Sequence, residues 1–348
     1  MIQGTPGPHT ILYGLTQMGS PLDLARAWVD AGTVPGVAAA VVDRSGVLEE
    51  TYAGVLATDG AAVGPDTRFA LASLTKPLTA AACLCAVEEE LLELDAEVRD
   101  GFTLRHLLSH CSGLPRDSSD PGVRPLEAPG QYRRYSNAGY ALAARLVEQQ
   151  AEMPFRDYLR SSVLDPLGMD ASLGLAPEDT ARTAVVRQPG VWSEGQQFFN
   201  SPAFRAAELA ESGGYASAIG YASFLRCLLD GGRAQGRALL ASETVEDMLS
   251  TQFGELPGGV EAVTLWDACP WGLGLDVRGT REPHWTGDSL SASANTHFGS
   301  SGTLAWIDRE RGVGLVVLAS RGSYSGWWMG EGGWADLTAA VLERFSRS

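Results

Sequence analysis

The sequence predicts an α+β fold in which strands near the two ends of the chain form one antiparallel sheet. Runs rich in β-forming residues occupy positions 36–43 and 47–57, joined by a hairpin signal at 44–46, and another such run covers 301–320. The residues between these runs follow mainly helical periodicity. We therefore expect a sheet flanked by N- and C-terminal helices, a mostly helical lobe from the middle of the chain, and a site at the seam between them.

The segment that leads into the helical region starts with a short strand. This strand is expected from Arg68 to Ala72, and the helical pattern SLTKPLTAAACLCAVEEELLEL follows from Ser73 to Leu94. Pro77 would break a helix interior, but a first turn tolerates it because its missing N–H has no intrahelical partner there. The helix is therefore expected to begin at about Ser73.

The rest of the chain alternates short helices with loops before it becomes strand-rich. The loop over 112–134 carries four prolines and is typical of a surface excursion near a site. A single domain is expected over residues 20–345, with an α/β lobe from about 20–70 and 210–348 and a helical lobe from about 71–209. Helices are expected over 103–110, 140–150 and about 334–346, and residues 213–229 are expected to form a glycine turn, a polar cap and a further helix. Strands are expected over 271–278 and on both sides of a turn at 309–312.

Composition argues against several classes of protein. With 348 residues, 45% of them apolar, the chain is long enough to bury a full core, and a net charge of −16 argues against a nucleic-acid or anionic-membrane surface. No run of eighteen or more apolar residues predicts a membrane span. The N-terminal segment MIQGTPGPHTILYG lacks the pattern of a secretory signal, so a cytoplasmic protein is expected. The five scattered cysteines are expected to be small buried side chains.

Lysine occurs only once in the chain. Of the 26 basic residues, 25 are arginines, and Lys76 is the single lysine. A lone lysine is expected where arginine cannot serve, and a guanidinium, unlike an amine, does not lose its proton in proteins. The composition therefore favours a role for Lys76 as a base.

Ser73 and Lys76 are three residues apart at the expected helix start, so the amine can reach the hydroxyl on one helix face. A serine hydroxyl is a weak nucleophile until a neighbouring base takes its proton. Lysine can be that base when burial and a helix N-terminus lower its pKa. The pair therefore predicts nucleophilic catalysis by Ser73.

Tyr135-Ser136-Asn137 is a second polar motif, placed in a loop just before the helix expected at 140. A tyrosine next to a lysine can relay a proton, and an asparagine amide can hold a substrate carbonyl. The alternative interpretation is a turn in which Asn137 caps the following helix.

His297-Phe298-Gly299-Ser300 is a third motif, and it runs into a strand. A donor side chain beside a glycine would let a substrate approach the strand edge closely. The alternative is that this lone histidine is structural.

The order and spacing of the three motifs resemble the serine β-lactamase and penicillin-binding-protein family, which has Ser-x-x-Lys, Ser-Asp-Asn and Lys-Thr-Gly motifs. The second motif, Tyr-x-Asn, resembles the second motif of the class C β-lactamase branch. This branch also includes D,D-peptidases, D-aminopeptidases and carboxylesterases of this fold. The likeness spans about residues 30–345 and includes RFALASLTKPLTA, TLRHLLSHCSGLP, GGYASAIGYASFLRCLLDGG and HFGSSGTLAWID. It implies a β-lactamase/transpeptidase-like fold and a β-lactamase-like catalytic domain.

The resemblance also implies a role for each motif residue. Ser73 would be the acylated nucleophile, Lys76 its activating base, and Tyr135 an assistant in proton transfer. Asn137 would hold the carbonyl region of the substrate. The backbone N–H groups of Ser73 and Ser300 would form the oxyanion hole.

His297 departs from the family pattern, because it stands where the third motif has a lysine that meets a substrate carboxylate. A neutral histidine supplies a hydrogen bond but no fixed charge at pH 7. Gly299 is expected to leave room for the substrate beside the strand. The expected enzyme is therefore a serine hydrolase that acts on small ester or amide substrates through an acyl-enzyme, most similar to a carboxylesterase.

Several alternatives stay open at this point. The same motifs fit a β-lactamase, a D-amino-acid peptidase or an acyltransferase, and also a penicillin-binding or sensor protein that is acylated without turnover. The residues do not identify a second base for deacylation, and they do not indicate an oligomeric state.

Other kinds of site are not expected. His106 and His110 have the spacing of a zinc pair, but Leu107 stands where zinc peptidases have Glu, so packing is the expected role of both histidines. The chain contains no Gly-x-Ser-x-Gly elbow, phosphate-binding loop or dinucleotide fingerprint. No metal and no cofactor are therefore expected. Trp327 and Trp328 are expected either to line an apolar acyl groove or to pack in the core.

Overall fold

The computed structural model describes residues 19–57, 60–187, 198–234, 236–261 and 263–346. The N-terminal segment MIQGTPGPHTILYG, which lacks the pattern of a secretory signal, lies outside these residues. Across the described ranges, the helices are all too short or too polar to span a bilayer.

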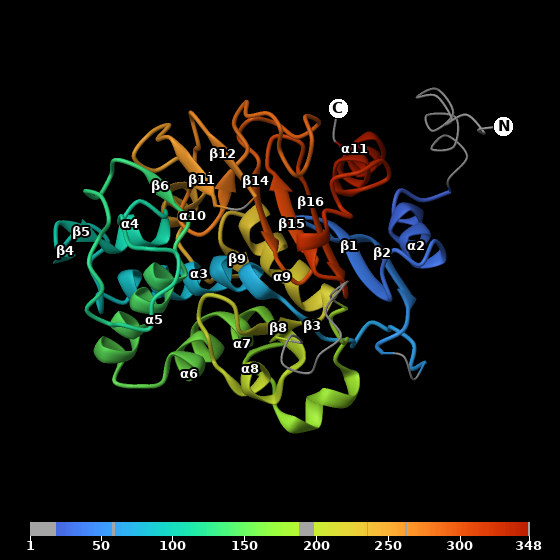
Figure 1. The fold of residues 1–348 in the computed structure, drawn as a ribbon, viewed down its shortest axis with the longest axis horizontal. Coiled ribbons are helices and arrows are strands. Elements are labelled where there is room, and N and C mark those ends of the chain that lie inside the picture. The colour runs from blue at the N-terminus through green and yellow to red at the C-terminus, as the bar shows by residue number, and fades with distance from the viewer. Residues whose placement is uncertain (1–18, 58–59, 188–197, 235, 262, 347–348) are drawn as a thin grey trace.

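The main sheet has six antiparallel strands in the order β13-β14-β15-β16-β1-β2 (Figure 1). The N-terminal strands join the C-terminal ones because β1 pairs with β16, with Val37 opposite Ala319 and Val42 opposite Gly314. This pairing confirms the predicted sheet. Its strands are β1 (Gly36–Asp43), β2 (Gly46–Gly54), β13 (Asp276–Val277), β14 (Asn295–Gly299), β15 (Thr303–Asp308) and β16 (Val313–Ala319).

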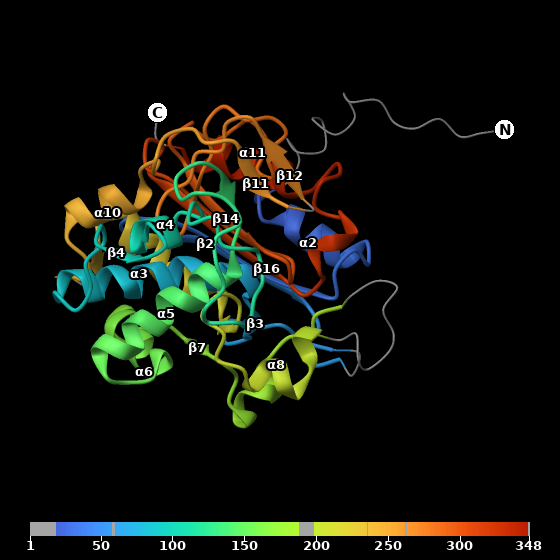
Figure 2. The same ribbon diagram turned by 60° about the vertical axis from the view of Figure 1, so that its left-hand side comes forward.

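Both faces of the sheet are covered, and β1 is therefore buried along its whole length. Successive residues of a strand point to opposite faces. Val37 and its alternate neighbours pack with α2 (Asp23–Asp30) and α11 (Trp334–Phe345). Ala38 and its alternate neighbours pack with α9 (Ala218–Leu229) and the helical part of the molecule. Figures 1 and 2 show α2 and α11 on one side of the sheet and the helical part on the other.

The middle of the chain forms the helical part, as predicted, with α3 at its centre packed against α5 and α6. Its helices are α3 (Thr75–Glu88), α4 (Leu104–Leu108), α5 (Asn137–Ala151), α6 (Phe155–Leu159), α7 (Asp165–Leu167) and α8 (Pro202–Ala206), and α10 (Ser242–Leu249) follows α9. Small sheets complete the fold: β3 (Phe69–Ala70) with β8 (Gly214–Ala216) and β7 (Ala171–Leu173); β6 (Arg133–Arg134) with β11 (Gly258–Val260) and β12 (Thr264–Trp266); β4 (Glu97–Arg99) with β5 (Phe102–Thr103); and β9 (Arg233–Ala234) with β10 (Arg237–Ala238).

The helix predicted from Ser73 to Leu94 is shorter than expected. Ser73 itself lies in a 3-10 turn, η1 (Ala72–Leu74), and α3 ends at Glu88. Glu90 has a φ of 59°, in the left-handed region, which stops the helix. Consecutive glutamates at this end repel one another and the negative end of the helix dipole, so the helix does not continue.

Two other predicted elements are also shorter. The strand predicted over 271–278 is reduced to β13, because the preceding loop packs tightly on α3: at Gly274 (φ 98°) a Cβ would lie 2.5 Å from the Ala80 Cβ. The helix predicted over 103–110 ends at Leu108, and His110 has a φ of 59°. The two histidines therefore do not share a helix face.

Candidate active site

Ser73 lies in a tight turn between β3 and α3. The residue before it, Ala72, has a φ of 47°, in the left-handed region that is costly for a residue with a Cβ. Such a conformation persists only where the surrounding structure holds it in place.

The loop after β14 and the first residue of β15 hold this turn. Ser301 Oγ donates a hydrogen bond to the carbonyl oxygen of Ala70 at 2.6 Å, and Thr303 Oγ1 donates one to the carbonyl oxygen of Leu71 at 3.0 Å. A Cβ on Gly299 would lie 2.2 Å from the same Leu71 oxygen. We expected Gly299 to leave room for a substrate, but the group that approaches it closely is the protein's own backbone.

Lys76 is completely buried, and its Nζ lies at the centre of the site. Nζ donates hydrogen bonds to Asn137 Oδ1 at 2.7 Å and to the Glu211 carbonyl oxygen at 2.8 Å, and it lies 3.4 Å from Ser73 Oγ. A neutral amine has two N–H groups and one lone pair. The two carbonyl acceptors can take both N–H groups, which leaves the lone pair for the Ser73 hydroxyl proton.

Burial lowers the pKa of Lys76 to about 7, with the Arg116 charge adding to the effect, while the carboxylates of Glu211 and Asp117 act against it. At neutral pH a substantial fraction of Lys76 is therefore unprotonated. This is the protonation state that a general base needs.

Asn137 is brought to Lys76 by the start of α5. Ser136 caps this helix, because its Oγ accepts a hydrogen bond from the Gly139 N–H at 2.9 Å. The alternative in which Asn137 is the cap is therefore wrong. Its amide instead bridges two groups, accepting from Lys76 and donating from Nδ2 to Asp117 Oδ1 at 2.7 Å.

Tyr135 lies directly beside the amine, with Lys76 Nζ 4.7 Å from the centre of its ring. Its hydroxyl is buried and interacts with the Ser73 hydroxyl. Burial raises the pKa of Tyr135, and the nearby Ser73 hydroxyl partly offsets this. The phenol therefore stays protonated at neutral pH and can pass a proton.

His110 packs against Tyr135 with 4.3 Å between ring centres and the rings tilted by 33°, and its Nδ1 accepts a hydrogen bond from the Ser136 N–H at 3.0 Å. His106 forms a capping box with Thr103 and stacks on Phe253 at 4.1 Å. Both contacts agree with the packing role expected for these histidines. No group of three or more metal-ligating side chains comes together in the residues that the structure describes.

His297 lies behind the site rather than in its wall. Its ring is buried, and Nδ1 donates a hydrogen bond to the Phe298 carbonyl oxygen at 2.9 Å. Burial, together with the Lys76 charge, lowers the pKa of His297 to about 3, so the ring is neutral. Phe298 and Ser300 line the pocket, and His297 does not. This differs from the expected contact between His297 and the substrate.

A pocket of about 380 Å³ opens in front of Ser73. Tyr135, Asn137 and Ser300 line it together with Ser73. The rest of the wall is partly apolar and partly acidic, and its residues were not predicted from the sequence. These residues are Arg116, Asp117, Phe198, Phe199, Leu209, Glu211, Ser212, Val260, Glu261, Val263, Phe298, Ser323 and Tyr324.

The proline-rich loop contributes to the pocket wall, whereas the two adjacent tryptophans do not. Arg116 and Asp117 come from the proline-rich loop over 112–134, which was predicted to lie near a site. Trp327 and Trp328 are absent from the wall and pack in the core instead: Trp328 stacks on Trp334 at 4.6 Å, and Trp327 lies 5.2 Å from Trp28.

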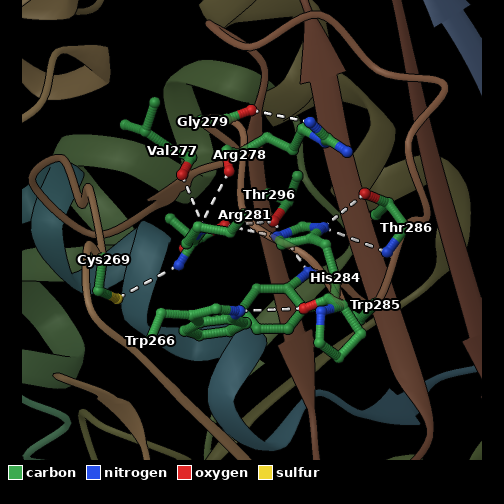
Figure 3. Close-up of polar contacts among 12 residues, drawn as sticks. Trp266, Cys269, Val277, Arg278, Gly279, Arg281, His284, Trp285, Thr286 and Thr296 are labelled. Carbon is green, nitrogen blue, oxygen red and sulfur yellow. Dashed lines mark hydrogen bonds and ion pairs between the residues drawn. The ribbon is translucent and has the colours of Figure 1, made fainter. Parts of the chain in front are cut away.

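A buried charged cluster beside β14 holds this strand in place (Figure 3). Asp276 accepts hydrogen bonds from Arg281, from His284 Nε2 at 3.0 Å and from Thr296 Oγ1 at 3.0 Å. Thr296 directly precedes His297 on β14, so the cluster fixes the strand that carries the third motif. The His284 ring also contacts Thr286 Oγ1 at 2.8 Å. Asp276, His284 and Thr286 are hydrogen-bonded in the same order as the carboxylate, imidazole and hydroxyl of a catalytic triad. Thr286, however, is completely buried and lies outside the pocket, so its hydroxyl does not face a substrate.

Comparison with known proteins agrees with this architecture. The profile of the Beta-lactamase family matches residues 23–326. A crystal structure of a beta-lactamase from Mycobacterium bovis is 30% identical, with 92% of this chain and 100% of that chain covered and a TM-score of 0.71. A family VIII carboxylesterase is 17% identical and has the same fold, with coverage of 98% and 99% and a TM-score of 0.75.

Curated relatives match over shorter stretches. "Penicillin-binding protein 4" of Amycolatopsis lactamdurans is 34% identical over 184 residues, which are 44% of this chain and 48% of that protein. The match thus spans about half of that relative's length. The fold, the pocket and the family profile together define a β-lactamase-fold protein of the serine-hydrolase kind. The chain belongs to the Beta-lactamase family.

Proposed function

We propose that this protein hydrolyses small esters and uncharged amides through an acyl-enzyme on Ser73, with Lys76 as the base. The observation that carries the proposal is the position of the buried Lys76 amine, 3.4 Å from Ser73 Oγ and bonded to two carbonyl oxygens. This arrangement holds a neutral amine with its lone pair free for the hydroxyl proton.

In acylation, Ser73 Oγ attacks the carbonyl carbon while its proton moves to Lys76 Nζ. The N–H groups of Ser73 and Ser300 stabilise the oxyanion that forms. As the tetrahedral intermediate collapses, the bond to the leaving alcohol or amine breaks. The leaving group takes the proton from Lys76, with the Tyr135 hydroxyl as the relay.

In deacylation, water attacks the ester carbonyl of the acyl-enzyme and gives its proton to Lys76 through the same groups. The bond to Ser73 Oγ breaks, and the serine recovers its proton. Asn137 holds Lys76 in place during both half-reactions and contacts the carbonyl region of the substrate.

The preference for uncharged substrates follows from the third motif. A substrate carboxylate would need a fixed cation on β14, but the residue there is the buried, neutral His297. The presence of a family VIII carboxylesterase among the structural neighbours also supports an esterase. Other proteins similar to this chain are named as a β-lactamase and a penicillin-binding protein, and these two functions are the alternatives to an esterase.

Intact-mass measurements test this proposal directly. The wild-type protein is expected to gain one fluorophosphonate adduct and to hydrolyse a p-nitrophenyl ester, but to form no adduct with a penicillin and not to turn it over. Ser73→Ala should remove both the label and the turnover, and Ser212→Ala, a second pocket serine, should still be labelled. Lys76→Arg should fold but lose ester turnover, because the guanidinium stays protonated.

The outcomes separate the alternatives. Labelling of Ser73→Ala would show that another residue is the nucleophile, and an active Lys76→Arg variant would reject Lys76 as the base. A penicillin adduct that persists without release would instead support a penicillin-binding sensor. Rapid penicillin hydrolysis would support a β-lactamase.

A further inference from the structure

Asp117 is bonded to the side-chain amide that contacts the buried amine of the site. Asn137 Nδ2 donates a hydrogen bond to Asp117 Oδ1 at 2.7 Å, and Asn137 Oδ1 accepts one from Lys76 Nζ at 2.7 Å. Lys76 Nζ in turn lies 3.4 Å from Ser73 Oγ. A carboxylate, an amide, an amine and a hydroxyl group therefore follow one another in a single series of contacts.

The backbone holds Asp117 at this place although its side chain is exposed. The carbonyl oxygen of Arg116 accepts a hydrogen bond from the Asn137 N–H at 2.7 Å. The carbonyl oxygen of Pro115 accepts a further one from Ser136 Oγ at 2.7 Å. The segment that carries Asp117 is thus attached to the start of α5, the helix that carries Asn137.

The amide of Asn137 could face the amine with either of its two ends. Its oxygen only accepts hydrogen bonds, and its NH2 group only donates them. An ammonium group also only donates, so a protonated Lys76 requires the amide oxygen. The neutral amine has a lone pair and can accept as well. In the reactive form of the site, Lys76 alone therefore no longer specifies which end of the amide it meets.

The inverted orientation of the amide would oppose catalysis. With Nδ2 toward the amine, an Asn137 N–H would donate to the lone pair of Lys76, and this lone pair could not take the Ser73 proton. The orientation in the structure uses an N–H of the amine instead, and it leaves one amide N–H for a substrate carbonyl. Activity should therefore scale with the fraction of sites in which the amide oxygen faces Lys76.

A carboxylate is a side chain that excludes the inverted orientation. An ionised carboxylate accepts hydrogen bonds and donates none. Inversion would turn Asn137 Oδ1 toward Asp117 Oδ1, and two acceptors would then face each other with no proton between them. The other carboxylate oxygen, Asp117 Oδ2, lies 3.5 Å from Arg116 Nε, so a positive charge holds the carboxylate from its second side.

We propose that Asp117 is a positioning residue of this site, which fixes the Asn137 amide with its oxygen toward Lys76. The lone pair of the neutral amine thereby stays available for the Ser73 proton. This inference rests on the proposed serine-hydrolase function and adds a residue to its machinery.

The rate at which a fluorophosphonate labels Ser73 measures this effect, because labelling needs the activated hydroxyl but no deacylation. Intact mass gives the rate across the pH range, and its plateau at high pH reports sites in which Lys76 is already neutral. Asp117→Glu keeps a side chain that only accepts and should retain most of the plateau rate. Asp117→Asn fits either end of the amide and should lower the plateau roughly twofold, and Asp117→Lys, which only donates, should lower it roughly tenfold or more.

The change of charge acts on a different part of the profile. The Asp117 carboxylate raises the pKa of Lys76, so Asp117→Asn and Asp117→Lys should move the rising limb to lower pH. The other charges that act on Lys76, those of Glu211 and Arg116, are the same in all these variants. A purely electrostatic role would move the limb and keep the plateau, whereas partial unfolding would lower the plateau without moving the limb.

Asp120→Lys is the matched control. It makes the same charge reversal in the same loop, at an exposed residue outside the described pocket wall, and should keep the plateau. Asn137→Ala tests the route of the effect: without the amide, the further change Asp117→Lys should no longer lower the plateau.

Three results would overturn the inference and leave the serine-hydrolase proposal intact. These are a wild-type plateau in Asp117→Lys, an equal loss in Asp120→Lys, and a loss from Asp117→Lys that is undiminished in the Asn137→Ala background. Absence of a label on Ser73 in the wild-type protein would contradict the proposed function itself, and the inference with it.

Discussion

Lys76 Nζ lies 2.7 Å from Asn137 Oδ1, and this contact places a neutral acceptor rather than a negative charge beside the amine. Asn137→Asp would put a carboxylate at nearly the same position. Since an opposite charge favours the protonated amine, the Lys76 pKa should rise by about 1 or more. The rising limb of the pH profile of kcat/KM for a neutral ester should move to higher pH by the same amount. Asn137→Ala, which adds no charge, should lower activity without that upward shift, and an unmoved limb in Asn137→Asp would contradict the assignment of Lys76.

The wild-type pH profile should itself rise through a midpoint near pH 7. Burial lowers the pKa of Lys76 to about 7, and activity increases as the amine loses its proton. Because the pKa of His297 is lowered to about 3, this histidine is already neutral over the whole limb. His297→Asn should therefore keep the limb. If the rising limb disappeared in a His297→Asn variant that is still active, the titrating group would be His297 and not Lys76.

Gly299→Ala should destabilise the turn that carries Ser73. The added Cβ would lie 2.2 Å from the Leu71 oxygen and 2.3 Å from Thr303 Oγ1, so either β14 or the turn must move. We expect a loss of about 1–3 kcal/mol in the free energy of unfolding, measured with urea, and a drop in ester kcat. Gly330→Ala is the control, because a Cβ there meets nothing within 4 Å. Equal stability of the two variants would reject the close packing of Gly299.

Asp276→Asn should be strongly destabilising although Asp276 lies outside the pocket. It would leave the buried Arg281 guanidinium without its carboxylate, a change that costs about 3–5 kcal/mol. The arginine charge lowers the pKa of Asp276 against the effect of burial, so its contribution is present above pH about 3.9 and is lost as the pH falls through the folded-state pKa.

Urea unfolding at pH 7 measures this loss. Glu246→Gln breaks an exposed pair with Arg309 and should change the free energy of unfolding by less than about 1 kcal/mol. If the Asp276 variant were no less stable than the Glu246 variant, the cluster would not be what holds β14.

The sequence was sufficient to predict the sheet and the Ser73–Lys76 contact. Alternation in the strands and a three-residue spacing in a helix are local patterns, and the structure confirms the proximity that they imply. The end of α3 was predicted too late, because the apolar pattern continues past Glu88 while the charges of the glutamates oppose a longer helix.

The pocket wall could not be predicted in the same way. Glu211 and Phe198 come close to Ser73 only through tertiary packing, and nothing in their local sequence distinguishes them from surface residues. We expected His297 to contact the substrate because it is a donor beside a glycine and occupies the place of the third-motif lysine. In a strand, however, adjacent side chains point to opposite faces, so the exposure of Phe298 to the pocket implies that His297 points away.

The hydroxyl groups that fix the Ala70 and Leu71 carbonyls belong to residues 301 and 303, 231 and 232 positions further along the chain. During translation Ser73 leaves the ribosome long before these partners are made. The strained turn at Ala72 therefore lacks this support until the chain has been synthesised beyond β16 and β14 to β16 have joined β1. A fragment that ends before residue 301 carries both Ser73 and Lys76 but lacks the two hydroxyl groups that fix the turn, so we expect such a fragment to be inactive.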